Sequence, residues 1–176
     1  MADTLRSLGY AGRITMLSSE PYPPIDRTKL SKALITDSSK ILLRTKEILE
    51  DLDIELVHCK VTKVNVDNKT VLTEDGKTVA YDKLVLSTGG SPKMLPLPGF
   101  DKLNGIYKLR TVPQAKDIVD AIGGGKKKVV IIGTGFIGME IAVALHKENE
   151  ITMIGMEGVP LLFLFNFSKL RVANVS

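Results

Sequence analysis

The stretch "VVIIGTGFIGME", residues 129–140, decides the fold class. Gly133, Gly135 and Gly138 match the pattern G-x-G-x-x-G, in which the glycines allow a tight turn, close approach to a pyrophosphate, and close packing of a helix on a strand. The β-branched strand "KVVII" precedes them, and a helix from about Gly135 to Lys147 follows. A strand buried on both faces in a parallel sheet has such a sequence. We therefore predict a dinucleotide-binding βαβ unit.

An acidic residue follows the loop at the expected distance. Glu157 lies 19 residues past Gly138, just after the predicted second strand "EITMIG". A carboxylate there can accept hydrogen bonds from both ribose hydroxyls, and it would repel the 2′-phosphate of NADP. The spacing favours NAD, and a glycine-rich turn without a ligand is the alternative.

The same spacing can be applied to the start of the chain. Glu20 follows the predicted strand "RITMLSS", and the position 19 residues before it is Met1. If Glu20 also binds a ribose, the last glycine of its loop falls at position 1. We therefore expect the chain to begin at or just after the glycine loop of an earlier nucleotide site, which makes the later motif the second of two.

The remaining elements follow from local patterns. From Val61 the alternation of apolar and polar residues predicts a three-stranded antiparallel meander, whose last strand lies in "TVAYDKLVLSTGG" and ends on glycines. Thr111 and Gln114 predict a capping box for a helix that ends at the glycines 123–125. Earlier helices and strands are predicted before Gly9, over 13–19, near Lys29 and within 45–58.

Composition excludes several classes of protein. The chain has 176 residues, 44% hydrophobic and 25% charged, which is typical of a globular protein. Its net charge of +4 is scattered, so we expect no nucleic-acid partner. The longest apolar run, "VPLLFLF", is far shorter than the roughly 20 residues of a membrane span. A single cysteine excludes a disulfide scaffold, no signal peptide is visible, and the histidines and the cysteine lack the spacing of a metal site.

Two nucleotide units around a meander ending in "LVLSTGG" resemble the flavoproteins of the pyridine nucleotide-disulphide oxidoreductase superfamily. The segment "PPIDRTKLSK" resembles the "PYxRPxLSK" signature of the apoptosis-inducing-factor-like proteins and of NADH-dependent ferredoxin and rubredoxin reductases. Ile25 replaces the usual aromatic residue of that signature, and Thr28 the usual proline.

The resemblance implies an α/β fold with two Rossmann-like FAD/NAD(P)-binding units, both incomplete, and an antiparallel β-meander. It divides the chain into a partial FAD-binding domain (1–90) that lacks its first glycine loop, a connector (91–110), a partial NADH-binding domain (111–158) and a divergent tail (159–176).

The resemblance also implies site residues. Glu20, with Ser19, would hold the adenosine ribose of FAD, and Arg27 and Lys32 would lie beside the pyrophosphate and the flavin. The other implied FAD contacts are Val61, Thr88, Gly89 and Arg110. The implied NADH contacts are Gly133, Thr134, Gly135, Phe136, Ile137, Gly138 and Glu157. Glu140 would lie beside the nicotinamide near Lys32, and these two are the implied catalytic residues.

The implied activity is hydride transfer from NADH to FAD, with electrons passing on to a ferredoxin-like or other acceptor. The segment after Glu20 lacks the cysteine pair of a dithiol reductase. Two alternatives remain open: a non-catalytic nucleotide-binding fragment, and a single-cofactor NAD dehydrogenase with an unrelated N-terminal domain. We expect a cytoplasmic or mitochondrial protein, without metal or membrane span.

Overall fold

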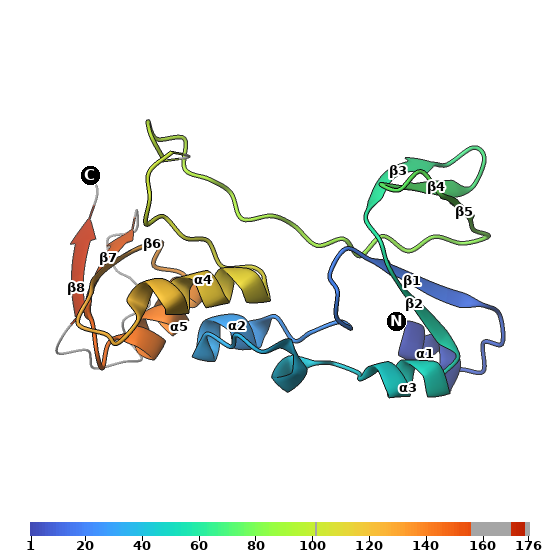
Figure 1. The fold of residues 1–176 in the computed structure, drawn as a ribbon, viewed down its shortest axis with the longest axis horizontal. Helices are drawn as coiled ribbons and strands as arrows, with labels where there is room; N and C mark the ends of the chain where they lie inside the picture. Colours follow the sequence, from blue (N-terminus) through green and yellow to red (C-terminus); the bar gives the residue numbers. More distant parts are fainter. Residues whose placement is uncertain (101, 156–169, 175–176) are drawn as a thin grey trace. The chain divides into compact units, whose positions relative to one another are not determined.

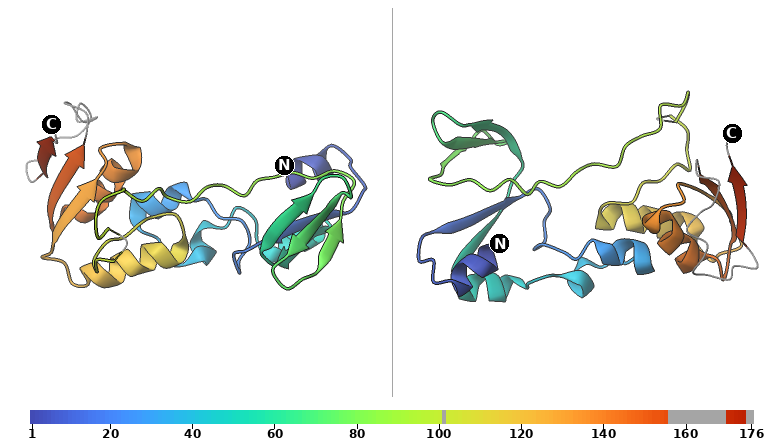
Figure 2. Two further views of the ribbon diagram at one scale, coloured as in Figure 1. Left: turned by 90° about the horizontal axis from the view of Figure 1, so that it is seen from above. Right: turned by 180° about the vertical axis from the view of Figure 1, so that it is seen from behind.

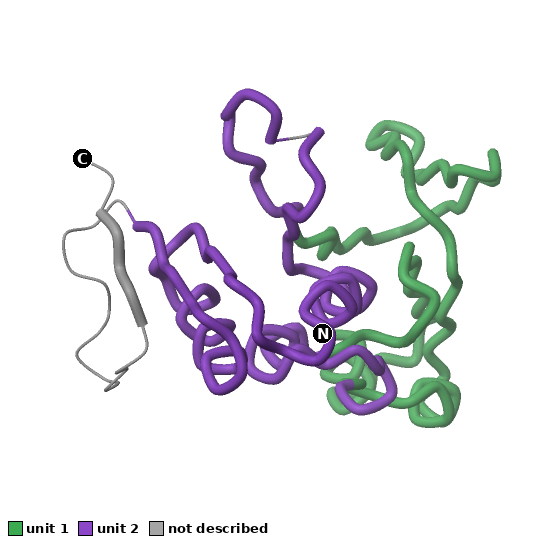
Figure 3. Tube along the Cα trace, turned by 60° about the vertical axis from the view of Figure 1, so that its left-hand side comes forward, with its two compact units in different colours: residues 1–25, 42–90 green, residues 26–41, 91–176 purple. Residues whose placement is uncertain are grey.

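The computed structural model describes residues 1–100, 102–155 and 170–174, the last as backbone. Its contacts divide the chain into two compact units (Figure 3). Unit 1 comprises residues 1–25 and 42–90, and unit 2 comprises residues 26–41 and 91–176. The segment 26–41, which follows "PYPP" (21–24) in the sequence, therefore belongs to the same unit as the later part of the chain.

Unit 1 begins with a short helix and a pair of parallel strands. The strands β1 (Ile14–Ser18) and β2 (Ile54–His58) pair in register from Ile14↔Ile54 to Ser18↔His58. Two short helices accompany them, α1 (Ala2–Ser7) and α3 (Lys46–Asp51). Because parallel strands end at the same edge of a sheet, the residues that follow Ser18 and His58 come together.

The antiparallel meander of unit 1 is shorter than predicted. Its strands are β3 (Val61–Asn65), β4 (Thr70–Thr73) and β5 (Thr78–Ala80) (Figure 1). The prediction that the third strand reaches the glycines is wrong, since residues 83–90 form no strand and Leu86 is 66% exposed. The physical reason is that β4 begins at Thr70, which pairs with Ala80, so β5 has no neighbour beyond Tyr81.

Unit 2 contains a three-stranded parallel sheet in the order β6–β7–β8. The strands are β6 (Lys128–Ile132), β7 (Glu150–Gly155) and β8 (Leu170–Asn174), and the helices are α2 (Thr28–Ala33), α4 (Val112–Ile122) and α5 (Phe136–Leu145). A 3-10 turn, η1 (Ser38–Ile41), follows α2. The elements β6, α5 and β7 match the predicted βαβ unit within two residues at each end. In the predicted tail, β8 is an element that the sequence did not suggest.

The helices of unit 2 lie on one face of this sheet (Figures 1 and 2). The shared core contains Leu34, Ile131, Met139, Ala142, Leu145, Ile151 and Met153. Leu34 follows α2 in the left-handed region (φ 46°), a strained conformation for leucine that its burial in the core compensates.

The other face of β6 is open among the described residues. Val130 is 57% and Ile132 is 53% exposed, so the prediction that "KVVII" is buried on both faces is wrong. The reason is that successive side chains of a strand point to opposite faces, and α5 covers only the face of Ile131.

Only half of the predicted capping box of α4 is formed. Thr111 Oγ1 accepts a hydrogen bond from the backbone N–H of Gln114 at 3.4 Å, which caps the helix. Gln114 Oε1 is buried without a hydrogen-bond partner in the described structure, so the reciprocal bond is absent.

Candidate nucleotide-binding site

The glycine loop joins β6 to α5 in unit 2. Gly133 has φ 112°, a backbone conformation that residues other than glycine rarely adopt. Its N–H donates a hydrogen bond to Ile154 O at 2.8 Å. This bond ties the loop to the end of β7. The loop therefore lies at the carboxyl edge of the parallel sheet, where ligands bind in open α/β sheets.

The three glycines of the loop have different surroundings. A Cβ on Gly138 would lie 2.2 Å from Gly133 O, so only glycine lets α5 pack this closely on the loop. A Cβ on Gly133 or Gly135 would meet nothing within 4 Å. Close packing at Gly138 and open space above the first two glycines are what an approaching diphosphate requires.

The first turn of α5 offers backbone donors. Gly135 is the N-cap residue and supplies no side chain to cap the helix. The first N–H groups of a helix have no partner within it, and together with the helix dipole they favour an anion. Phe136 and Ile137 follow with side chains that are 75% and 58% exposed. The residues present thus fit the phosphates of a dinucleotide.

Thr134 closes the loop against β7. Its side chain is buried, and a Cβ on Gly155 would lie 2.5 Å from Thr134 Oγ1, so the end of β7 admits only glycine beneath it. Glu157, the predicted ribose-binding acid, lies outside the described residues.

Glu140 lies one turn into α5 and contacts α2. Its Oε2 accepts a hydrogen bond from Ser31 Oγ at 2.5 Å. Lys32, the next residue of α2, is exposed, and no ion pair joins it to Glu140 in the part of the chain that the structure describes. The structure therefore brings Glu140 to the helix of Lys32 through the neighbouring serine.

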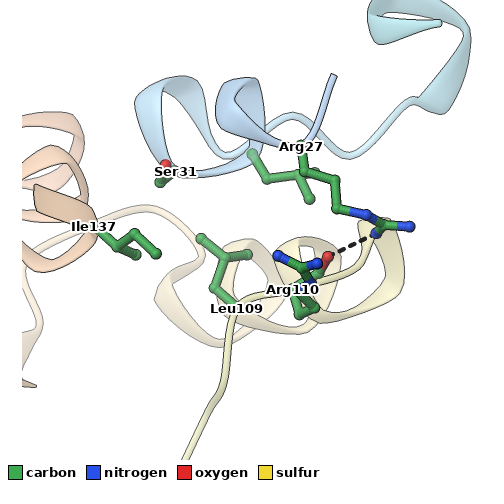
Figure 4. A pocket seen from close by; sticks show the side chains of 6 residues that line it. Arg27, Ser31, Leu109, Arg110 and Ile137 are labelled. Atoms are coloured by element: carbon green, nitrogen blue, oxygen red, sulfur yellow. Dashed lines mark hydrogen bonds between the residues drawn. The ribbon is translucent and has the colours of Figure 1, made fainter. Parts of the chain in front are cut away.

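Two predicted arginines meet in a small pocket of unit 2 (Figure 4). Arg27 donates to the backbone oxygen of Arg110 at 2.9 Å. The pocket is lined by Arg27, Leu30, Ser31, Leu109, Arg110 and Ile137. Its volume of about 40 Å³ suits a few water molecules. Two guanidinium groups beside a serine hydroxyl suit an anionic or polar group.

A carboxylate next to Arg27 stays ionised. The Thr28 hydroxyl donates to Asp26 Oδ1 at 2.7 Å and the Thr28 N–H at 3.1 Å. The hydrogen bond from the Thr28 hydroxyl is the main reason why the pKa of the Asp26 carboxyl lies below its ordinary value. The start of α2 therefore carries a negative charge beside the arginine.

In unit 1, Ser19 and Glu20 follow β1 at the carboxyl edge of the β1–β2 pair. Tyr22 donates its hydroxyl to Glu20 Oε1 at 3.0 Å, and the Glu20 N–H donates to Ser18 Oγ at 3.2 Å. His58 Nε2 lies 3.2 Å from Ser19 O. The acid is thus held at the end of its strand, where a ribose-binding carboxylate belongs.

The other predicted residues of unit 1 lie further along the chain. Val61 begins β3 and is half-buried. Thr88 and Gly89 lie in the exposed segment 83–90, and Gly89 has φ 68°. The predicted FAD contacts are therefore divided, since unit 1 holds Ser19, Glu20, Val61, Thr88 and Gly89, and unit 2 holds Arg27, Lys32 and Arg110.

Two residues of these sites were missed by the sequence analysis. Ser31 bonds Glu140 across 109 positions, and Tyr22 holds Glu20. No spacing pattern identifies either one. The one hint in the sequence is that Ser31 directly follows the apolar Leu30 in a short helix, and both residues are buried in the structure.

Other kinds of site were also sought. Within residues 1–100 and 102–155, no three His, Cys, Asp or Glu side chains gather closely enough to hold a metal ion. No helix in the described part of the chain has the length and apolar character that crossing a membrane requires.

Comparison with known proteins supports the same architecture. The family model described as pyridine nucleotide-disulphide oxidoreductase matches residues 1–163. Apoptosis-inducing factor 3 of Homo sapiens is 37% identical over 161 residues, 90% of this chain and 26% of that protein. Rhodocoxin reductase of Rhodococcus erythropolis is 35% identical over 158 residues, 87% of this chain and 36% of that protein.

A solved structure extends the match to the fold. A ferredoxin reductase from Rhodopseudomonas palustris superposes with a TM-score of 0.86 at 27% identity, over 98% of this chain and 46% of that one. The predicted resemblance and the predicted fold class are confirmed. The chain spans less than half the length of each of these three proteins.

Proposed function

Because the chain belongs to the pyridine nucleotide-disulphide oxidoreductase family, whose members are FAD- and NADH-dependent oxidoreductases, we propose that it carries parts of both nucleotide sites of an NADH-dependent flavoprotein reductase. Unit 2 would bind NADH, and unit 1 would hold the adenosine end of FAD. When bound, the two cofactors supply the hydride chemistry.

The glycine loop at the start of α5 carries this proposal. It combines an uncapped helix N-terminus, open space at Gly133 and Gly135, and a packing contact at Gly138 that admits no larger residue. Backbone donors there would bind the diphosphate. Thr134, Phe136 and Ile137 would line the dinucleotide, and Glu157 would accept hydrogen bonds from the ribose.

The carboxylate of Glu20 supports the second half of the proposal. Tyr22 holds it after β1, and Ser19 lies beside it. We assign the adenosine ribose of FAD to Glu20 and Ser19, with Val61, Thr88 and Gly89 as further FAD contacts. Arg27, Lys32 and Arg110 supply positive charge for the pyrophosphate and the flavin.

Glu140 and Lys32 are the proposed catalytic residues, since they would contact the nicotinamide and the flavin. The electron acceptor would be a ferredoxin-like protein, in keeping with the ferredoxin reductase that this chain resembles. A cytoplasmic or mitochondrial location stays a prediction.

A single substitution tests the NADH site without weakening the helix. Gly135→Asp places an acid at an N-cap position, where aspartate is favoured, so α5 should keep its stability. The same carboxylate would repel the diphosphate. We expect NADH affinity to fall at least about tenfold, measured by titration of NADH fluorescence on the full chain.

Gly124→Asp is the matched control, because Gly124 also has open space but lies in the turn after α4. It should bind NADH as the unaltered chain does. The proposal would be contradicted if the Gly135→Asp variant bound NADH as tightly as the unaltered chain, or if the unaltered chain bound no NADH. Flavin absorbance after incubation with FAD separates a two-cofactor protein from a fragment that binds only NADH.

A further inference from the structure

Ser31 is the buried contact between α2 and Glu140. The residue is only 5% exposed, and its Oγ lies 2.5 Å from Glu140 Oε2 and 3.3 Å from Thr28 O. A serine hydroxyl has one proton and can donate to one acceptor at a time. The carboxylate is closer and charged, and hydrogen bonds to charged acceptors are the stronger ones. The proton therefore points to Glu140.

The donor is held rigidly on both sides. Leu30, which precedes it, is 2% exposed, and Leu34 at the end of α2 lies in the core of unit 2 with Met139 and Ala142 of α5. The carboxylate of Glu140 is therefore fixed by a donor that cannot follow it into solvent. The exposed Lys32 has no such constraint.

The position of this bond relates it to the loop. Glu140 lies two residues past Gly138, and Ser31 lines the same pocket as Ile137 of the first turn of α5. A change in the orientation of Glu140 would alter the polar surface that follows the phosphate loop. It would leave the loop backbone itself unchanged.

We propose that Ser31 is a positioning residue for Glu140, and that it sets the affinity for the nicotinamide end of NADH while leaving the adenine end unaffected. The inference rests on the proposed function, because it takes Glu140 to contact the nicotinamide. Ser31 itself acts through Glu140.

The test compares two probes on the full chain, NADH and ADP-ribose, by isothermal titration calorimetry. ADP-ribose has the diphosphate and both riboses and lacks the nicotinamide. Ser31→Ala should weaken NADH binding at least about tenfold, the effect of losing one hydrogen bond to a charged group. ADP-ribose binding should change less than about twofold, which also shows that unit 2 is folded.

Two further variants make the result specific. Glu140→Gln should weaken NADH to a similar degree, and the double variant should lose little more, because both changes remove one interaction. Ser39→Ala is the matched control, since its hydroxyl bonds the exposed Asp37 at 2.7 Å in the same unit. It should leave both affinities unchanged.

The outcomes separate the two proposals. NADH binding by Ser31→Ala as tight as that of the unaltered chain would overturn the role of Ser31 while the proposed function stands. Equal losses for NADH and ADP-ribose would overturn it too, since they would indicate a general structural effect. If the unaltered chain binds neither probe, the proposed function fails, and the role of Ser31 fails with it.

Discussion

The parallel sheets of the two units differ in what stabilises them. In unit 2, the buried Ile131, Ile151 and Met153 pack under α5 in a continuous apolar core. In unit 1, all five residues of β1 are only half-buried. Parallel sheets in proteins are normally buried on both faces. The sheet of unit 1 has only two strands among the described residues, so it has little apolar surface to bury.

Unit 1 relies more on polar contacts. The Arg6 side chain, 11% exposed, donates to the backbone oxygens of Leu52, Tyr10, Gly12 and Asp53 at 2.5 to 2.8 Å. One guanidinium thus joins α1, the start of β1 and the turn before β2. The comparison teaches that the two parallel sheets depend on apolar burial to different extents. In unit 1 the buried Ile54 of β2 and Leu49 of α3 supply it, and the hydrogen-bonded clamp of Arg6 adds to it.

The largest effect is expected in the core of unit 2. Met153→Ala removes a fully buried side chain, and we expect a loss of about 2–5 kcal/mol in the free energy of unfolding. Urea denaturation followed by the amide NMR signals of β6 and β7 measures it. Met16→Ala in β1, at a half-buried position, should cost about 1 kcal/mol. Equal losses at the two sites would show that the units do not differ.

The next effect is expected from the clamp of unit 1. Arg6→Lys keeps the charge but cannot reach four carbonyl groups at once, so unit 1 should lose about 2 kcal/mol. Amide hydrogen exchange of β1 and β2 reports this loss. Arg13→Lys is the control, because Arg13 is 80% exposed and its one ion pair among the described residues is with Glu55. It should change stability by less than about 0.5 kcal/mol. Unchanged amide hydrogen exchange of β1 and β2 in the Arg6→Lys variant would contradict the stabilising role of the Arg6 hydrogen bonds.

Helix caps should matter equally in both units. Thr45 caps α3 and Thr111 caps α4, and each accepts a backbone hydrogen bond at 3.4 Å. Each change to alanine should cost about 1 kcal/mol, because a cap acts locally. Circular dichroism during urea denaturation measures both. A much larger loss at one threonine would mean that the cap also supports the core of its unit.

The smallest effect concerns pH and the β4–β5 turn of unit 1. Hydrogen bonds from Lys77 and Thr73 lower the pKa of Asp75 to about 2. An acid with a lowered pKa stabilises the fold above its unfolded pKa, roughly 4, and this stabilisation is lost as the pH falls through about 2. The NMR shifts of the turn in the folded protein should therefore change with a midpoint near pH 2, over about pH 3 to pH 1. In the Asp75→Asn variant, a transition that persists over that range would assign it to another group.

Local patterns explain what the sequence predicted well. The run "KVVII", the glycines of the loop and the N-cap Thr111 each specify structure within a few residues, and β6, α4 and α5 form where expected. The family resemblance followed from such motifs.

Contacts between distant residues explain the rest. The third meander strand forms as β5 but is shorter than predicted, because strand length depends on the partner strand and β4 is only four residues long. The packing of α2 onto α5 and the bond from Ser31 to Glu140 join segments 109 positions apart, which no local pattern encodes. The exposure of Val130 depends on which face the helices cover.

Hydrogen–deuterium exchange of the full chain with and without NADH tests the central claim most directly. We predict that NADH slows exchange at the amides of residues 133–139, at the start of α5, and leaves those of β1 (Ile14–Ser18) unchanged. Unchanged exchange at residues 133–139 under saturating NADH, or equal slowing in β1, would contradict the assignment of the NADH site to unit 2.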